Sequence, residues 1–277
     1  MEPAGGFYFD GTGFCASGSP DAGIFEEGDF YEVLRVMDGV CLFVKDHLNR
    51  LNDSILLSGI TRLPDTRWIQ DIIAELIFKN HLVSGNIKLV LKAMTDGRQV
   101  LYAFCIPFSY PEPVHYLNGV TTAVYNAMRL NPNVKRLVPV LQEPLQKFIA
   151  DKKVYEALLT DNHDRILEGS RSNVFFIRGA EVLTAPGDRV LKGITRMKVI
   201  YLCNKLNISL IEKAISINDL NKTEGVFITG TSPKILPVRR IDECIYPTDH
   251  LVLRKLMVAY DLLVREEIEK LKGNPGK

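Results

Sequence analysis

The chain has 277 residues and only five cysteines, and none of them forms a C-x-x-C pair. Scattered cysteines in an odd number argue against a disulfide framework and a cysteine-ligated zinc site. No apolar run approaches the ~20 residues that a membrane-spanning helix needs. A block of one charge is also missing, and the formal net charge is +1. We therefore expect neither nucleic acid nor a membrane surface as a partner.

Several catalytic motifs with fixed spacing are absent. The sequence has no Walker loop, no Gly-x-Ser-x-Gly nucleophile elbow and no His-Glu-x-x-His motif, and we expect no metal site. Residues Met1 to Gly6 lack the basic and apolar regions of a signal peptide. We expect a cytoplasmic protein with reduced cysteines.

Two hairpins are predicted in the first part of the chain. Asp38-Gly39 and Asp96-Gly97 are turn signals, and each lies between two segments in which apolar and polar residues alternate. The predicted strands are 30–36, 40–44, 86–94 and 100–108. We expect these strands to pair antiparallel in a sheet, with the two strands of each hairpin joined by a short turn.

The spacing of apolar residues predicts two helices between these hairpins, at 45–59 and 66–82. Gly59 would end the first helix, and Asp65 or Thr66 would cap the second. The side chains that we expect to face the core are Leu48, Leu51, Ile55 and Leu56 in the first helix and Trp68, Ile72, Ile73, Leu76 and Ile77 in the second.

The second part of the chain is predicted to contain short strands and three longer helices without regular alternation of strand and helix, which favours a barrel-like core. Pro107, Pro111 and Pro113 mark a connection before it. We predict an α+β protein with an N-terminal domain at 1–112, a linker at 113–118 and a C-terminal β-barrel-like domain at 119–277. The predicted elements are strands 119–126, 155–159, 166–168, 173–177, 181–184, 209–213, 225–229 and 235–239, and helices 143–153, 194–206 and 249–272, with a short helix near 217.

Five motifs follow one another along the chain. They are Tyr31-Glu-Val-Leu-Arg35, His47-Leu-Asn-Arg-Leu51, Glu168-Gly-Ser-Arg-Ser-Asn-Val-Phe-Phe176, Leu191-Lys-Gly-Ile-Thr-Arg196 and Phe227-Ile-Thr-Gly-Thr-Ser-Pro-Lys-Ile-Leu-Pro-Val238. Together they resemble the fold-type IV family of pyridoxal-phosphate (PLP) enzymes, which includes branched-chain and D-amino-acid aminotransferases and aminodeoxychorismate lyase. The resemblance implies a small N-terminal α/β sandwich with antiparallel strands and a larger C-terminal pseudo-barrel.

The resemblance also implies roles for Tyr31 and Arg50 of the first two motifs and for Lys135, which lies outside the five motifs. Lys135 stands where the family places the lysine that forms a Schiff base with PLP, although Arg136-Leu-Val-Pro139 departs from the residues that usually follow it. Tyr31 would face that lysine and the substrate. Arg50 would bind the cofactor phosphate, a task that suits the planar fork of a guanidinium. Lys147, Lys152 and Lys153 are weaker candidates for the same role, because we expect them to lie on an exposed helix.

The later motifs supply the remaining cofactor contacts. Glu168 would pair with the pyridine nitrogen and keep it protonated, so that the ring accepts electrons from the substrate α-carbon. Ile194 and Thr195 open a helix, and a helix start has N–H groups that can hold a phosphate. The other cofactor-binding residues implied by the resemblance are Asn173, Leu191, Thr231 and Ser232.

From these residues we predict an aminotransferase that exchanges an amino group between an amino acid and a 2-keto acid, and that forms a homodimer as its relatives do. A PLP-dependent lyase of the aminodeoxychorismate lyase type is the alternative, and a degenerate binding or scaffold protein is a remote one. The segment from Thr95 to Gln99 is short and lacks the Arg-x-His with which D-amino-acid aminotransferases take the substrate carboxylate. The sequence leaves the substrate, and whether it is an L- or D-amino acid, open.

Overall fold

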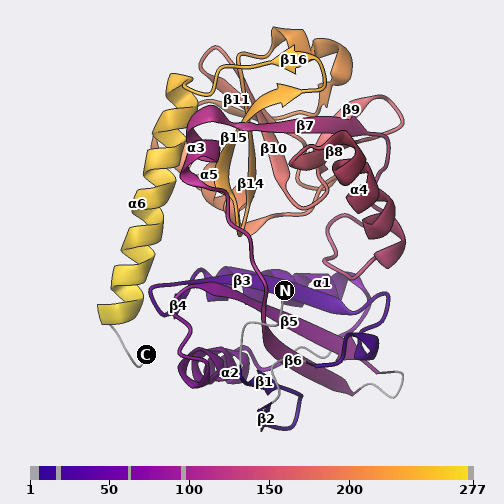
Figure 1. The fold of residues 1–277 in the computed structure, drawn as a ribbon, viewed down its shortest axis with the longest axis vertical. Coiled ribbons are helices and arrows are strands. Elements are labelled where there is room, and N and C mark those ends of the chain that lie inside the picture. The colour runs from indigo at the N-terminus through magenta and orange to yellow at the C-terminus, as the bar shows by residue number, and fades with distance from the viewer. Residues whose placement is uncertain (1–5, 17–19, 62–63, 95–97, 274–277) are drawn as a thin grey trace. The chain divides into compact units, whose positions relative to one another are not determined.

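The computed structural model of the protein describes residues 6–16, 20–61, 64–94 and 98–273, which form two compact units (Figure 1). The first comprises Met1–Ser109, Val134–Val138 and Val264–Lys277, and the second comprises Tyr110–Asn133 and Pro139–Leu263. The turn expected at Asp96-Gly97 and most of the N-terminal residues searched for a signal peptide lie outside the described residues. None of the described helices is both long and apolar enough to cross a membrane.

A six-stranded antiparallel sheet forms the centre of the first unit, in the order β2-β1-β6-β5-β3-β4. Its strands are β1 Tyr8–Phe9, β2 Phe14–Cys15, β3 Phe30–Met37, β4 Val40–Cys41, β5 Gly85–Ala93 and β6 Gln99–Ile106, and the 3₁₀ helix η1 spans Ala22–Ile24. The hairpin at Asp38-Gly39 is confirmed, with both residues at positive φ as a tight turn of this kind requires. The returning strand is shorter than predicted because Phe43 already adopts the left-handed conformation before the next helix.

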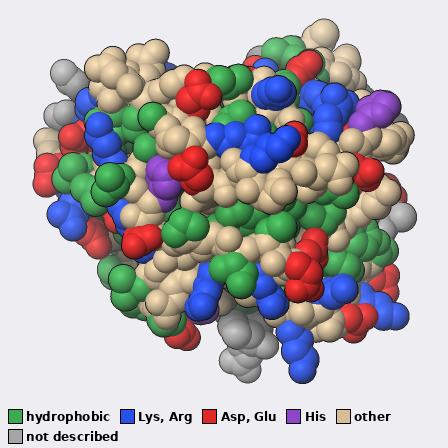
Figure 2. All heavy atoms as spheres, turned by 90° about the horizontal axis from the view of Figure 1, so that it is seen from above, with side chains coloured by type: hydrophobic (Ala, Val, Ile, Leu, Met, Phe, Trp, Pro, Cys, Tyr) green, Lys and Arg blue, Asp and Glu red, His purple; other side chains and the backbone are tan. Residues whose placement is uncertain are grey.

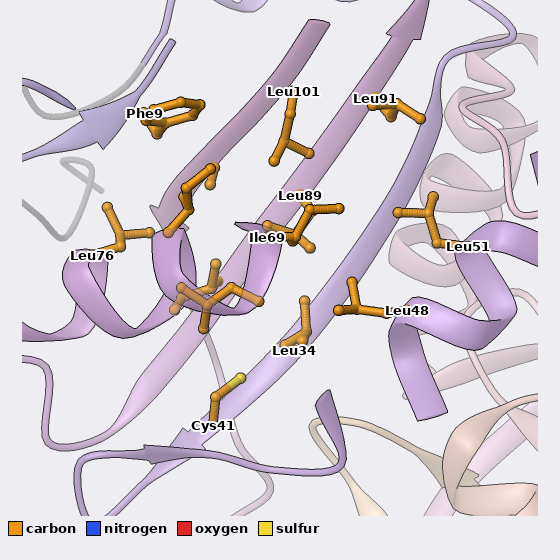
Figure 3. Packing of buried hydrophobic residues seen from close by; sticks show 14 of the residues in the cluster. Phe9, Leu34, Cys41, Leu48, Leu51, Ile69, Leu76, Leu89, Leu91 and Leu101 are labelled. Atoms are coloured by element: carbon orange, nitrogen blue, oxygen red, sulfur yellow. The ribbon is translucent and has the colours of Figure 1, made fainter. Parts of the chain in front are cut away.

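Helices α1 (Val44–Leu57) and α2 (Thr66–Lys79) both pack on one face of this sheet (Figure 3). Asp65 caps α2 by accepting the N–H groups of Arg67 and Trp68. Most expected core residues are buried, but Leu56 and Trp68 are 49% and 42% exposed. Both lie at the edge of the apolar stripe of their helix, where spacing alone does not separate the core side from solvent.

The second unit is built around a closed barrel. Six strands form the ring of the barrel, and within this ring each pairs with two others. They are β7 Val120–Tyr125, β8 Glu156–Thr160, β9 Arg165–Gly169, β10 Asn173–Arg178, β14 Gly225–Gly230 and β15 Lys234–Ile241. The ring runs β10-β14-β15-β7-β8-β9 and closes through the pairing of β9 with β10. The expected combination of an antiparallel α/β sandwich and a pseudo-barrel is therefore confirmed.

Shorter strands and several helices accompany this barrel. The strands are β11 Glu181–Thr184, β12 Leu210–Glu212, β13 Ile215–Ser216 and β16 Cys244–Ile245, and the helices are α3 Pro113–Asn118, α4 Pro139–Lys152, α5 Ile194–Lys205, η2 Ile217–Lys222 and α6 Leu251–Gly273. The last helix, α6, belongs to the second unit up to Leu263 and to the first unit from Val264. The segment 113–118, which the prolines suggest as a linker, forms α3, with Pro113 in the first turn, where proline fits a helix.

Leu34 tests the core of the first unit because it is completely buried against the residues of α1 and α2. Leu34→Ala is expected to lower the free energy of unfolding by about 2–5 kcal/mol, since the cavity cannot fully collapse. Leu57→Ala is the matched control, because Leu57 is 64% exposed on α1, and should change it by less than about 0.5 kcal/mol. Urea unfolding followed by circular dichroism measures both, and equal effects would contradict the packing described.

Candidate active site

Lys135 lies on a short extended segment that pairs with the beginning of β3. The N–H of Tyr31 donates to the Lys135 carbonyl at 3.2 Å, and the N–H of Leu137 donates to the Asp29 carbonyl at 2.9 Å. The N–H of Lys135 itself donates to Ser54 Oγ on α1, at 3.2 Å. These bonds fix the backbone of Lys135 on the sheet of the first unit, although Lys135 lies far from β3 in the sequence.

The side chain of Lys135 lies against Tyr31. Its Nζ is 4.3 Å from the centre of the Tyr31 ring, a cation–π contact. A second lysine, Lys88 of β5, has its Nζ at 5.4 Å from the same ring. Burial lowers the pKa of Lys88, Tyr31 opposes this, and the charge of Lys135 lowers it further. The structure thus brings the expected lysine and tyrosine together and adds a second amine that the sequence analysis does not single out.

The three other lysines considered from the sequence are on the surface. Lys147 and Lys152 are exposed on α4, and Lys153 is exposed directly after it. Lysines in such positions are solvated, and none of these three makes a contact like that of Lys135 with Tyr31 among the contacts described. Lys88 is therefore the stronger rival for the role proposed for Lys135.

Arg50 belongs to a buried ionic cluster. Its Nε and Nη2 donate to the two oxygens of Glu32, at 2.8 and 2.6 Å, and His47 Nδ1 lies 2.7 Å from Glu32 Oε2. Glu32 is completely buried, although it belongs to β3, whose other inward residues are apolar. The bidentate pair fixes the plane of the Arg50 guanidinium, which the sequence analysis assigns to a phosphate.

The pKa values of this cluster follow from its burial and its charges. Burial alone would raise the pKa of Glu32, but the charge of Arg50 and the hydrogen bonds from His47 and Arg50 lower it to about 2. Burial lowers the pKa of His47, and its hydrogen bond to Glu32 opposes this shift. Near neutral pH the cluster therefore holds an ionised carboxylate, a guanidinium and a neutral imidazole.

Glu168 is buried at the end of β9 in the second unit. Its Oε2 accepts the N–H of Leu191 at 3.2 Å, and its Oε1 forms an ion pair with Arg129 Nε at 3.3 Å. Arg129 also donates through Nη2 to the carbonyl of Ser170. Arg129 lies in a polar loop and has no role that its sequence context suggests, yet it forms an ion pair with the expected partner of the pyridine nitrogen.

Asn173 connects the barrel to the start of α5. Its Nδ2 donates to the Leu191 carbonyl at 2.8 Å. A Cβ at Gly193 would overlap Oδ1 of Asn173, so glycine is needed for this close approach. Gly193 is also the N-cap of α5 and has no side chain with which to cap it. The N–H groups at Ile194 and Thr195 therefore belong to a helix end that suits an anion.

Thr231 and Ser232 lie in the turn between β14 and β15, and both are half-buried. Thr229, just before this turn, pairs with Asn173 of β10 in the strand register. The turn and the start of β10 therefore share one end of the barrel. Thr229 is 1% exposed, and its Oγ1 has no hydrogen-bond partner among the described residues.

These features fit a phosphate-bearing cofactor that reacts with an amine. A buried hydroxyl without a partner is costly, and an uncapped helix start next to it has N–H groups to donate, so both are satisfied by an anion. Glu168 lies at the same end of the barrel, opposite Asn173 in the register. Among the described residues, no group of three His, Cys, Asp or Glu side chains could hold a metal ion.

Charged side chains of both signs are mixed on the face of the molecule drawn in Figure 2, where Lys and Arg lie in separate groups with acidic and apolar side chains beside them. This distribution agrees with the balanced composition of the chain, with 34 basic and 33 acidic residues. Some charged side chains are buried instead, and among them are Glu32 in the first unit and Glu168 in the second.

Acid is expected to destabilise the protein through His47. Its pKa is lower in the folded protein than its ordinary value of 6.5, so the unfolded chain binds the proton more tightly and stability falls as the pH drops below 6.5. Between about pH 7.5 and pH 5.5, the wild type should lose up to about 1.4 kcal/mol per pH unit more than His47→Gln. Urea unfolding across this range measures the difference, and parallel pH profiles would contradict the assignment.

The chain resembles known protein sequences over most of its length. The family model described as amino-transferase class IV matches residues 29–241. A Methanocaldococcus jannaschii protein that carries the name of a branched-chain-amino-acid aminotransferase is 30% identical over 238 residues, which are 80% of this chain and 81% of that one. A D-alanine aminotransferase from Bacillus licheniformis is 29% identical over 240 residues, 82% and 84% of the two chains.

Solved structures show the same fold. The branched-chain amino acid aminotransferase of Escherichia coli has a TM-score of 0.83 and 20% identity, over 94% of this chain and 95% of that one. A Legionella pneumophila protein described as a 4-amino-4-deoxychorismate lyase has a TM-score of 0.77 and 22% identity, over 86% and 92%. At this level of identity the likeness concerns the fold, and it includes structures named as transferases and as lyases.

Proposed function

We propose, since this chain belongs to the class IV aminotransferase family, that it moves an amino group between an amino acid and a 2-keto acid with PLP attached covalently to Lys135. The observation that carries this proposal is the position of Lys135. Its backbone is hydrogen-bonded to β3, and its Nζ lies 4.3 Å from the centre of the Tyr31 ring. When bound, PLP would supply an electron sink for the charge that develops at the substrate α-carbon.

Within this proposal, Lys135 is both the attachment point and the group that moves the proton at the α-carbon. Its backbone is held by Tyr31 and Ser54, so the side chain swings from a fixed base. The Tyr31 ring restricts that swing on one side. Lys88 places a second amine beside the same ring, with its Nζ 5.4 Å from the ring centre.

Glu168 is the proposed partner of the cofactor's ring nitrogen. Its carboxylate is already oriented by the Leu191 N–H and the Arg129 guanidinium, and both of these interactions favour its ionised form. Asn173 and Leu191 would hold the cofactor beside it. An ionised Glu168 would hold a proton on the ring nitrogen.

The phosphate would be held by groups from three parts of the chain. We assign to it the N–H groups at Ile194 and Thr195, the hydroxyls of Thr231 and Ser232, and Arg50. Support for the helix start comes from Gly193, which leaves that end uncapped. Support for Arg50 comes from Glu32, which holds its guanidinium plane.

Attachment at Lys135 can be tested directly. After incubation with PLP and borohydride, the wild type should carry one pyridoxyl group on the peptide that contains Lys135, whereas Lys135→Ala should carry none. Lys147→Ala, which changes an exposed lysine of α4, is the matched control and should behave as the wild type. Peptide mass spectrometry gives the position, and an adduct on Lys88 in the wild type would sink the assignment.

Transfer and elimination differ in what one substrate alone can do. A transaminase stops after one half of its reaction with the amino group left on the cofactor, so an amino acid alone should bleach the visible absorption and a 2-keto acid should restore it. A lyase restores its starting state in every turnover. A panel of L- and D-amino acids, followed by absorbance, also identifies the stereochemistry. Pyruvate release from aminodeoxychorismate with no bleaching by any amino acid would favour the lyase.

A further inference from the structure

Glu156, the first residue of β8, is a buried carboxylate outside the residues assigned so far, and it is 2% exposed. Its Oε1 accepts the N–H of Ala157 at 3.1 Å and the hydroxyl of Ser170. Its Oε2 accepts the N–H of Arg171 at 3.3 Å and the hydroxyl of Ser172 at 3.0 Å. Three of these four donors belong to the loop between β9 and β10. This side chain therefore holds that loop together with the Ser170 N–H, which donates to the Ala157 carbonyl at 2.8 Å.

The loop is the immediate continuation of Glu168. Gly169 donates its N–H to the Ser172 carbonyl at 2.7 Å, which closes a tight turn. A Cβ at Gly169 would overlap Ser172 Oγ and would lie 3.0 Å from Cγ of Glu156, so the turn is packed directly on the Glu156 side chain. A change in the position of the loop would therefore be transmitted to Glu168.

The same loop also determines where Arg129 lies. The Ser170 carbonyl accepts a hydrogen bond from Arg129 Nη2, while Arg129 Nε pairs with Glu168. The Ser170 hydroxyl, on the same residue, donates to Glu156. Glu156 thus holds the residue that anchors the cation next to Glu168, as well as the turn that follows Glu168.

We propose that Glu156 is a positioning residue for Glu168 and acts through the Ser170–Ser172 loop on the contact between Glu168 and the cofactor's ring nitrogen. This inference rests on the proposed function. It concerns the ring nitrogen first, because the Ser170–Ser172 loop holds Arg129 and follows Glu168 directly, whereas the aldehyde is assigned to Lys135 and the phosphate to residues outside this loop.

Glu156→Gln is the informative substitution because of how the donors are divided. Each carboxylate oxygen accepts one hydroxyl and one backbone N–H. A serine hydroxyl can turn round and accept a bond from the glutamine NH₂ group, but a backbone N–H can only donate. With the amide NH₂ at the Oε2 position, the Arg171 N–H faces another donor and the loop must shift. With the NH₂ at the Oε1 position, the Ala157 N–H loses its acceptor, and Ser170 of the loop must reverse its hydroxyl bond.

The test compares two cofactors in the full-length protein. One is PLP, and the other is its carbocyclic analogue, in which a C–H group replaces the ring nitrogen and leaves the aldehyde and phosphate unchanged. Glu156→Gln should raise the Kd for PLP about tenfold and leave the Kd for the analogue nearly unchanged. Equal weakening of both ligands, or no weakening of either, would overturn the proposal, because a merely structural role does not distinguish them.

Two further variants complete the experiment. Tyr246→Phe removes one buried hydrogen bond elsewhere in the same unit, to the Leu220 carbonyl, and should leave the ratio of the two Kd values unchanged. Ser172→Ala removes one of the loop's donors and should give a smaller loss specific to PLP, and it decides the matter where Glu156→Gln does not fold.

A wild type that binds neither ligand would refute the proposed function and this inference with it. A wild type that binds PLP at Lys135, with a Glu156→Gln variant that does not discriminate, would refute the inference alone.

Discussion

The pairing of Glu168 with Asn173 closes the barrel of the second unit, and the proposed cofactor contacts of that unit depend on it. Because these residues face each other across the closing strands, their side chains are held at one end of the barrel. Asn173 then bonds to the Leu191 carbonyl and packs on Gly193, which fixes the start of α5 at that end. The local strand pairing thus determines where a helix from another part of the chain begins.

The first unit depends on a different constraint, which is the charge of Glu32 in the core. A carboxylate without solvent is tolerated only if its oxygens are matched by cations or donors, and Arg50 and His47 of α1 provide them. This requirement fixes the rotation of α1 against β3 more narrowly than apolar packing does. The Arg50 guanidinium is consequently held in one orientation, which a ligand can use without a further loss of side-chain entropy.

The sequence predicts the elements well where the signal is local, and less well where it is not. The predicted helix 45–59 agrees with α1. The prediction that Trp68 faces the core is wrong, because helical spacing identifies the apolar face of a helix but not how far the core extends along it. The resemblance, and not the local sequence, selects Lys135. Glu32 does have a local signal, since it is a charge at an inward position of the alternating strand β3. Glu156 has none, because its partners lie across a strand connection.

Glu32 and Glu156 are both buried acids, yet they differ in what their substitution can reveal. Neutralising Glu32 would leave the Arg50 charge buried without its counter-ion, at a cost of about 3–5 kcal/mol, which is enough to unfold many domains. Glu156 is held by neutral donors, and its change to glutamine leaves only one N–H unmatched, at about 1–3 kcal/mol. The protein should survive the second change but not always the first. Positioning can therefore be separated from stability at Glu156, whereas at Glu32 the two effects are bound together.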